Sequence, residues 1–370
     1  MYKPRIPGQS PLAQILKEYR GKYDITQEQL ANELSIDVRT LRRYENGESA
    51  QTDINELRRI ASILGIDSER LGILPDLSTP EEIDATIDRL WHLVRVGRNY
   101  EANIAVDRLM HNVTGLIKSE DTTLLRRLAH AQHLAGYVKS VITRSNEVAI
   151  PYAYYQAMEQ TARLLNDQTL LNIALTYQGD MLVRGNDVNR GIIYHEAARD
   201  TTPLADISAR GNGIQLLGRA YLRASRLSDF DRAMKESEEL AHQLDTPNNT
   251  SAKGQYSLGT VLEEYGRSYA QLGDTNKAMD YLDQAEKSLD HTEHWEILLK
   301  TARAIALVRG GEIKQGVNVA VESVALCKQY GTIRLMERIL GVQQYIDRLT
   351  KEIGTAGNTL REALYGPIEY

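Results

Sequence analysis

Three arginines lie close together within the stretch Ile25–Gly47, at Arg39, Arg42 and Arg43. A guanidinium group offers a fixed fork of hydrogen-bond donors that matches a phosphate group or the O6 and N7 edge of guanine. Asp37 precedes the arginines at a position suited to cap a helix, which would place Arg39 at the exposed amino end of that helix. These residue types at this spacing predict contacts with nucleic acid.

Short amphipathic helices are expected around these arginines. Residues 12–19 carry apolar side chains at helical spacing, and Thr26 is suited to cap a second helix. Leu41 and Tyr44 would anchor the inner face of the arginine-bearing helix. Two further helices follow, of which the last is short. We therefore predict a five-helix head over residues 1–74.

The charge of the chain is unevenly distributed. Its 370 residues carry a net charge of −6, but residues 1–75 hold eleven basic and eleven acidic side chains, so the rest of the chain carries the whole negative charge. A neutral head with gathered arginines suits site-directed contact with DNA. One cysteine, no secretory signal and no apolar run long enough to span a membrane predict a cytoplasmic protein without an intrachain disulfide.

Three segments of the head follow one another in a fixed order. They are TQEQLA at residues 26–31, ENG at residues 45–47 and LRRIASILGI at residues 57–66. In this order they are similar to the pattern of the Xre/phage-repressor family of helix-turn-helix proteins. The resemblance implies an all-α domain that reads double-stranded DNA through the major groove.

The resemblance also assigns roles to single residues. It implies that Gln27 holds a phosphate and supports the recognition helix, and that the backbone around Asn46 contacts another phosphate. It implies a pair between Arg20 and Glu45 that fixes the geometry of the motif. The candidate DNA-binding residues are Gln27, Asp37, Val38, Arg39, Thr40, Arg42, Arg43 and Asn46.

Val38 departs from the relatives that carry glutamine at its position. A valine side chain can contact a thymine methyl group but cannot read an adenine. We therefore expect discrimination between sequences to rest mainly on Arg39 and Arg43, at ~1–3 kcal/mol for each arginine that forms two hydrogen bonds with guanine. In the alternative interpretation, Arg42 and Arg43 are solvated charges on an exposed helix face.

Beyond a predicted linker at residues 75–80 (PDLSTP), only helices are expected. Residues 262–285 are similar to the tetratricopeptide repeat, in which small residues let two antiparallel helices approach closely. Weaker copies lie at Leu90–Val106, Gly179–Ala198, Gly218–Ala233 and Ala304–Ala320. Residues 81–353 are therefore predicted to form a right-handed superhelix of tetratricopeptide-like hairpins, and residues 354–370 a short amphipathic tail with loose ends.

A stack of such hairpins is expected to leave an extended concave groove for a peptide or protein ligand. Asparagine and glutamine side chains can hydrogen-bond the main chain of an extended ligand. The candidate groove residues are Asn172, Gln178, Asn212, Gln215 and Tyr256. The alternative for each of them is an ordinary solvated helix position.

Two histidine pairs have a spacing that is compatible with a metal. His130 with His133, and His291 with His294, would each share a helix face. Because no cysteine or paired carboxylate beside them completes a site, we interpret both as solvated surface pairs. No catalytic motif is recognised, and no metal or cofactor is expected.

A repressor-type head joined to a tetratricopeptide-like body resembles, in its architecture, the RRNPP family of bacterial peptide-sensing regulators. The resemblance implies a homodimer that reads a palindromic operator and holds a short signalling peptide in its groove. One alternative keeps the DNA-reading head but makes the body a protein-interaction scaffold without a small ligand. Another makes the body an enzyme or an enzyme inhibitor, and the missing acid–base residues weaken the enzyme version.

Overall fold

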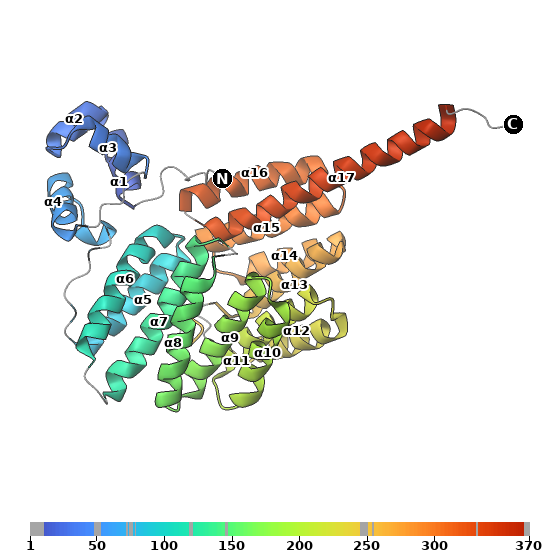
Figure 1. Ribbon diagram of the computed structural model, residues 1–370, viewed down its shortest axis with the longest axis horizontal. Coiled ribbons are helices and arrows are strands. Elements are labelled where there is room, and N and C mark those ends of the chain that lie inside the picture. The colour runs from blue at the N-terminus through green and yellow to red at the C-terminus, as the bar shows by residue number, and fades with distance from the viewer. Residues whose placement is uncertain are drawn as a thin grey trace.

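The computed structural model describes residues 11–47, 53–71, 73, 77, 79–117, 121–144, 147–244, 251–253, 255–330 and 332–365. Every regular element within these ranges is a helix. Figure 1 shows a small group of blue helices, from the N-terminal part of the chain, beside a large body of stacked helices. The prediction of an all-α fold with a helical head and a body of helix pairs is confirmed.

The head contains α1 (Pro11–Tyr23), α2 (Gln27–Glu33), α3 (Val38–Glu45), α4 (Ile54–Leu64) and the 3-10 helix η1 (Ser68–Leu71). Thr26 caps α2 in a reciprocal capping box with Gln29, and Asp37 caps α3. Buried leucines and isoleucines from all these elements form one core. The fifth helix that the sequence predicted is a single 3-10 turn.

The predicted linker at 75–80 lies partly outside the described residues, since only three of its six positions are described. Thr79 caps α5 (Pro80–Arg95) in a capping box with Glu82, and the proline occupies the first turn, where its missing N–H is tolerated. Leu77 is buried against the body. The helical structure of the body therefore begins at Pro80.

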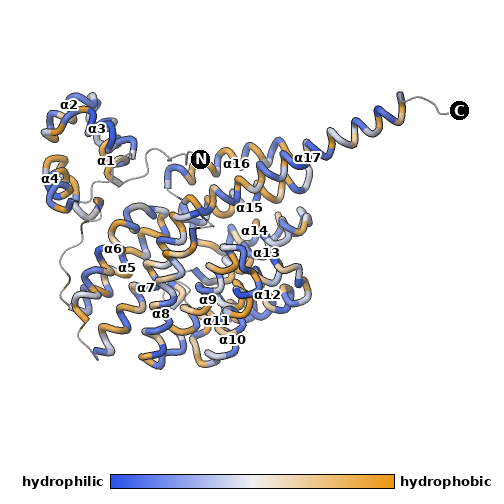
Figure 2. The backbone as a smooth tube through the Cα atoms, viewed as in Figure 1, coloured by the Kyte–Doolittle hydropathy of each residue, from blue (hydrophilic) through white to orange (hydrophobic). Residues whose placement is uncertain are grey.

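Six consecutive helix pairs build the body. They are α5 with α6 (Asn99–Leu116), α7 (Thr122–Ile142) with α8 (Ala149–Leu164), α9 (Gln168–Arg184) with α10 (Val188–Thr201), α11 (Ile207–Arg223) with α12 (Leu227–Ala241), α13 (Leu258–Leu272) with α14 (Thr275–Ser288), and α15 (Glu293–Arg309) with α16 (Ile313–Tyr330). Hydrophobic and hydrophilic residues alternate along these helices (Figure 2), as expected where each helix buries one face. Five of the pairs coincide with the predicted repeat copies, and the pair α7–α8 was missed.

Small residues let the two helices of a pair approach closely. A Cβ atom added at Gly266 of α13 would lie 2.7 Å from Cγ of Leu282 in α14, closer than real side chains pack. The pair α7–α8 uses the same device, because Gly136 leaves room for the ring of Tyr155. The repeat pattern did not reveal it, since the partner is a large ring and not a second small residue.

The last helix, α17 (Ile333–Tyr365), extends beyond the stack. Its first half packs against α15 and α16 and reaches α7. Residues 351–365 are exposed on every side, and Figure 1 shows this end projecting from the body. The sequence predicted a short turn with loose ends from Gly354, but Gly354 lies within a continuous helix that ends at Tyr365. Residues 366–370 of the predicted tail lie outside the described residues.

The stack curls until its first and last pairs meet. Nδ2 of Asn99, at the start of α6, donates a hydrogen bond of 3.4 Å to the carbonyl oxygen of Tyr330, and the Tyr330 ring packs against Gly97. The hydroxyl of Tyr137 in α7 donates a hydrogen bond of 2.7 Å to Gln255, just before α13. The concave side is therefore enclosed, and the prediction of an extended open groove is corrected.

Candidate functional site

Helix α3 presents its arginines to solvent. Arg39, Arg42 and Arg43 are exposed, while Leu41 and Tyr44 of the same helix are buried in the core of the head. Residues three and four positions apart share a helix face, so the three guanidinium groups form one basic surface. The guanidinium groups of Arg39 and Arg43 form no hydrogen bond or ion pair with any residue that the structure describes.

Asp37 and Thr40 order the amino end of α3. Oδ1 of Asp37 accepts a hydrogen bond of 2.8 Å from the backbone N–H of Thr40, and Oδ2 accepts one of 2.5 Å from its hydroxyl. The hydrogen bonds from Thr40 hold the pKa of Asp37 below its ordinary value. Val38 is partly buried against the head core. These three predicted DNA-binding residues thus also fix the start of the helix.

A chain of four side chains connects α1, α2 and α3. Nε of Arg20 donates to Oε1 of Glu45 at 2.6 Å, and Nε2 of Gln27 donates to Oε2 of the same carboxylate at 2.6 Å. Nε of Arg42 donates to Oε1 of Gln27 at 3.1 Å. The pair of Arg20 and Glu45 that the family resemblance implied is present. Gln27 connects this pair to Arg42 on the exposed face of α3. Arg42 is therefore oriented by the protein.

The end of α3 uses its own backbone donors. The N–H of Asn46 donates to the carbonyl oxygen of Arg42 at 2.9 Å, and the N–H of Gly47 donates to that of Tyr44 at 3.0 Å. Both N–H groups are therefore occupied within the helix end. The expectation that the backbone around Asn46 contacts a phosphate group stays a prediction.

A cluster of charged side chains faces the enclosed concave side of the body. It comes from α9, α11, α13 and α17 and borders a cavity of about 60 Å³. The members of this charged cluster are Asp180, Arg184, Arg219, Glu263, Glu264, Arg267, Arg334 and Arg338. Five arginines therefore accompany three carboxylates around this cavity.

All three of these carboxylates are paired with arginines of the stack, and Glu263 lies 3.7 Å from Nε of Arg267. Asp180 lies 2.7 Å from Arg184 and 3.4 Å from Arg219, while Glu264 pairs with Arg219 and Arg267. Burial alone would raise the pKa of the Asp180 and Glu264 carboxyl groups. Arg184 and Arg219 nevertheless hold the pKa of Asp180 below its ordinary value, and Arg219 with Arg267 lowers that of Glu264 to about 2. Both groups therefore remain charged inside the protein at neutral pH.

The two arginines of α17 lack such partners. Arg334 and Arg338 form no hydrogen bond or ion pair within the described part of the chain. Burial lowers the pKa of Arg334 to about 10, with Arg184 adding to the effect. Burial and the nearby Arg267 and Arg334 lower the pKa of Arg338 well below its ordinary value. Uncompensated positive charge at this depth favours the binding of an anion.

Two of the five predicted groove residues line the cavity. Nδ2 of Asn212 lies 3.4 Å from the hydroxyl of Tyr177, and Nε2 of Gln215 donates to the carbonyl oxygen of Thr260 at 3.1 Å. Oε1 of Gln215 is buried without a hydrogen-bond partner. These two amides are therefore placed where a ligand could use them, which stays a prediction.

The other three predicted groove residues do not line the cavity. Nδ2 of Asn172 donates to Oγ1 of Thr202 at 2.8 Å and thereby ties α9 to α10. Gln178 donates to Glu159 of α8 at 2.7 Å. Tyr256 is fully buried, and its hydroxyl donates to the carbonyl oxygen of Ser237. Their polar groups contact neighbouring helices in this structure, and their expected role in ligand binding stays a prediction.

The interpretation of the histidines as solvated surface pairs was wrong for His133 and His294, which are 1 % and 7 % exposed. His133 lies among aromatic rings, including those of Trp91 and Tyr177. Burial lowers its pKa to about 3. Among the described residues, no group of three or more histidine, cysteine or carboxylate side chains could hold a metal. None of the described helices is long and apolar enough to cross a membrane.

The arginines of the body were missed from sequence. The available signal was the recurrence of an arginine in the second half of the first helix of three successive pairs, at Arg184, Arg219 and Arg267. No repeat pattern could indicate Arg334 and Arg338, because α17 lies outside the pairs and reaches the cavity only when the stack curls.

The fold and the basic surface of α3 define the class of the head. Residues 16–71 match the helix-turn-helix family HTH_3. The head is therefore an Xre-type helix-turn-helix domain, as the sequence predicted, and it belongs to a class of DNA-binding domains, not of enzymes. The match covers the head alone. No curated protein sequence matches the chain.

Three solved structures align with most of the chain. PlcR of Bacillus thuringiensis in complex with the peptide PapR7 and DNA is 14 % identical, over 75 % of this chain and 96 % of that chain, with a TM-score of 0.39. The apo form of the competence regulator ComR from Streptococcus vestibularis is 16 % identical, over 82 % and 99 %, with a TM-score of 0.39. ComR from S. thermophilus in complex with DNA and its signalling peptide ComS is 16 % identical, over 81 % and 99 %, with a TM-score of 0.37. PlcR and ComR are regulators of the RRNPP type.

Proposed function

We propose that the chain is a sequence-specific transcription regulator that binds a palindromic operator as a homodimer and whose body senses a short peptide or a protein. One observation carries the DNA-reading part. Arg39 and Arg43 project from α3 without a described partner, while the contacts of Arg20 and Gln27 with Glu45 fix the helix beneath them. Base readout needs donors of this kind on a rigidly held helix.

The projecting end of α17 supports the homodimer. Apolar residues recur there at alternating intervals of three and four positions, at Ile339, Val342, Ile346, Leu349, Ile353, Ala356, Leu360 and Ala363. We call this row the α17 seam. Ile339 and Val342 are buried in the body, whereas Ile353 and Leu360 are 69 % and 61 % exposed.

The α17 seam has the a and d spacing of a coiled coil, and its exposed half continues a face that is already packed in the body. An isolated helix of this length is marginal in water without tertiary packing. We therefore propose that α17 of a second copy of this chain covers the exposed half of the seam. Two heads would then be held at a defined distance, which a two-fold operator requires.

The charged cluster supports ligand sensing by the body. Its excess of arginines favours an anion, but a cavity of about 60 Å³ is too small for a peptide. Binding there would require α17 to move, so the ligand would act by shifting the population towards an opened body. Because α17 carries Arg334 at one end and the seam at the other, its displacement would change the spacing of the heads relative to the ~34–36 Å of one DNA turn.

One observation favours a second candidate for the body. The first and last pairs of the stack meet and close its concave side in this structure. A scaffold that binds partners on its outer surface does not need an open groove. The two functions are separable. A sensor should gain thermal stability from one short peptide and change its operator affinity with that peptide. A scaffold should co-purify with a folded partner and leave operator binding unchanged.

The DNA-reading function can be tested by selection from random duplexes. The full chain is incubated with a library of random double-stranded DNA, and bound duplexes are amplified and sequenced over several rounds. We expect enrichment of one sequence whose two halves are related by two-fold symmetry. Enrichment of a single half-site would refute the dimer, and recovery of unenriched library would refute sequence-specific binding.

A further inference from the structure

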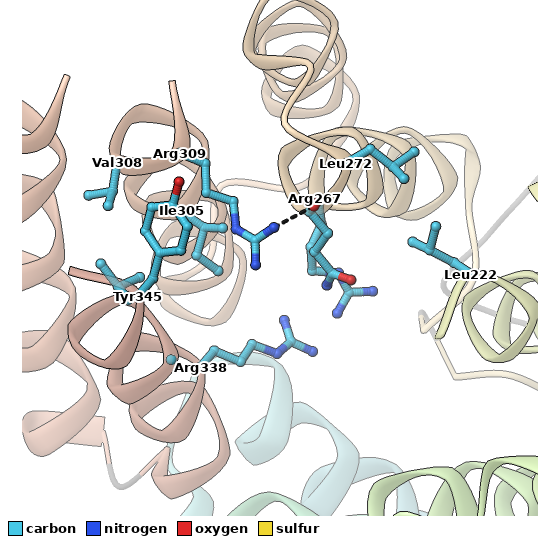
Figure 3. Close-up of a pocket in the computed structure, with 11 residues that line it drawn as sticks. Leu222, Arg267, Leu272, Ile305, Val308, Arg309, Arg338 and Tyr345 are labelled. Atoms are coloured by element: carbon cyan, nitrogen blue, oxygen red, sulfur yellow. Dashed lines mark hydrogen bonds between the residues drawn. The ribbon is translucent and has the colours of Figure 1, made fainter. Parts of the chain in front are cut away.

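A second pocket lies beside the charged cluster, between α13, α15 and α17. Its volume is about 390 Å³, within the range of small-ligand sites. Arg267, Arg309 and Arg338 line it, and no aspartate or glutamate does. Figure 3 shows these three arginines projecting into the same space from three different helices. We call this site the arginine pocket.

The three guanidinium groups are not fully used by the protein. Arg309 donates to the carbonyl oxygen of Gln271 and lies 5.3 Å from the ring centre of Tyr345. Arg267 is 4 % exposed and pairs with Glu264 on the side of the charged cluster, while its Nε lies 3.7 Å from Oε1 of Glu263, too far for a hydrogen bond. Arg338 has no hydrogen bond or ion pair within the described residues. Arg338 is half-buried and Arg309 is exposed, so both guanidinium groups keep donors that a ligand in the pocket can reach. A ligand that accepts from them would form charge-assisted hydrogen bonds.

Apart from Gln271, the rest of the wall is apolar. Leu222, Leu272, Ile305, Val308 and Val342 line the pocket together with the ring of Tyr345. An inorganic anion would satisfy the arginines but leave this wall in contact with water. A ligand with a carboxylate at one end and an apolar group next to it would satisfy both, because a guanidinium fork binds a carboxylate through two parallel hydrogen bonds.

We propose that the arginine pocket binds a carboxylate attached to an apolar group. Two ligands share this chemistry, namely the carboxyl terminus of a short peptide that ends in an apolar residue, and a fatty acid. The proposal gives the ligand class of the sensing function proposed above and depends on that function only for its effect on DNA. Binding itself is tested without DNA.

The test uses two matched pairs of probes on the full chain. The first pair is acetyl-Gly-Leu-Leu with a free carboxyl terminus and the same peptide as its amide. The second pair is decanoate and decanol. Isothermal titration should show that the carboxylate of at least one pair binds tenfold or more tightly than its uncharged partner. Binding of the peptide acid identifies a peptide terminus as the source, and binding of decanoate alone identifies a fatty acid.

Two variants separate the pocket from general charge effects. Arg338→Gln should weaken binding of the carboxylate probe at least tenfold. Arg348→Gln is the matched control. Arg348 lies on the same helix and also 5.3 Å from the ring centre of Tyr345, but it does not line the pocket. The Arg348 variant should bind the probe as tightly as the unaltered chain does. Equal loss in both variants, or no preference for the carboxylate in either probe pair, would overturn the proposal. Failure of the unaltered chain to select a DNA sequence would refute the proposed function and leave this result intact.

Discussion

Nε2 of Gln27 donates a hydrogen bond of 2.6 Å to Oε2 of Glu45, which joins the first turn of α2 to the last turn of the recognition helix α3. The other carboxylate oxygen accepts from Arg20 of α1 at 2.6 Å. Glu45 is 2 % exposed, so this contact lies inside the head. This buried carboxylate therefore helps to fix the orientation of α3 and of its exposed arginines.

Glu45→Gln should loosen the head. A glutamine cannot accept from both donors and leaves Arg20 without its counter-charge, so we expect a loss of about 1–3 kcal/mol in local stability. Hydrogen exchange of the α3 backbone amides in the full chain should become at least about tenfold faster. Glu33→Gln on the exposed face of α2 is the control. Unchanged exchange in the Glu45 variant would show that the carboxylate does not hold α3.

Replacing Arg39 and Arg43 together by alanine should remove sequence preference. Each guanidinium that forms two hydrogen bonds with guanine contributes ~1–3 kcal/mol of discrimination. The ratio of affinities for a selected and a scrambled duplex, measured at one salt concentration, should fall by a factor of at least about ten, with helicity unchanged. Lys17→Ala, on the exposed surface of α1, should keep the ratio. A double variant that still prefers the selected duplex would refute base readout by these arginines.

Gly211→Ala should destabilise the pair α11–α12. A Cβ atom there would lie 2.0 Å from the Tyr256 ring, whose hydroxyl is held by Ser237 and which has no space to move into. Overpacking of this kind costs about 1–3 kcal/mol, so the melting temperature of the full chain should fall. Gly115→Ala in α6, where nothing lies within 4 Å of the added Cβ, should leave the melting temperature unchanged or raise it slightly. Equal melting temperatures for the two variants would contradict the close approach.

Acid should weaken the fold through its buried histidines. Burial lowers the pKa of His133 to about 3, whereas in the unfolded chain it is ~6.5. Between these two pKa values the unfolded state therefore binds more protons than the folded state. The contribution of His133 to the free energy of unfolding is complete above about pH 6.5 and declines by about 1.4 kcal/mol per pH unit as the pH falls. The pKa values of His195 and His294, lowered by burial to about 4, act in the same direction.

His133→Phe should reduce this dependence on pH. The phenyl ring fits among the aromatic neighbours of His133 and takes up no proton. Urea unfolding at about pH 7 and about pH 5.5 should show a loss of stability smaller by about 1 kcal/mol than in the unaltered chain. His242→Phe, at an exposed position, is the control. An identical loss in the His133 variant would contradict the assignment of this acid sensitivity to His133.

Charges in the α17 seam should separate the dimer. Ile353→Asp combined with Leu360→Asp places two carboxylates at exposed seam positions, where burial against a second helix would be unfavourable. Analytical ultracentrifugation should then report a monomer. Lys351→Asp with Asn358→Asp adds carboxylates on the opposite face of the helix and should leave a dimer. A dimer in both double variants would place the contact elsewhere on the chain.

The head could be predicted almost completely from sequence, because its structure is set by local signals. Caps at Thr26 and Asp37 and the spacing of buried leucines are read directly along the chain, and the Arg20–Glu45 pair came from the family pattern. The exposed arginines needed only the helix period. The engagement of Asn46 in the helix end was missed, since it depends on where the last turn closes.

The body was predictable only pair by pair. Glycines such as Gly266 indicate where the two helices of a pair are in contact. The curvature of the stack, however, depends on how the six pairs pack against one another. That curvature closed the expected groove and brought Arg334 and Arg338 against residues that lie far earlier in the chain. Asn172 and Gln178 were predicted as ligand contacts, but both donate hydrogen bonds to neighbouring helices. The sequence does not indicate which group a side-chain amide will hydrogen-bond in the folded chain.

Specific recognition of DNA by the full chain is the claim on which the rest depends, and an equilibrium titration tests it most directly. The duplex recovered by selection and a scrambled duplex of the same composition are titrated with the full chain at physiological salt, with fluorescence anisotropy as the readout. We predict that the selected duplex binds about 10³-fold or more tightly than the scrambled one. Equal affinities for the two duplexes would contradict a DNA-reading head.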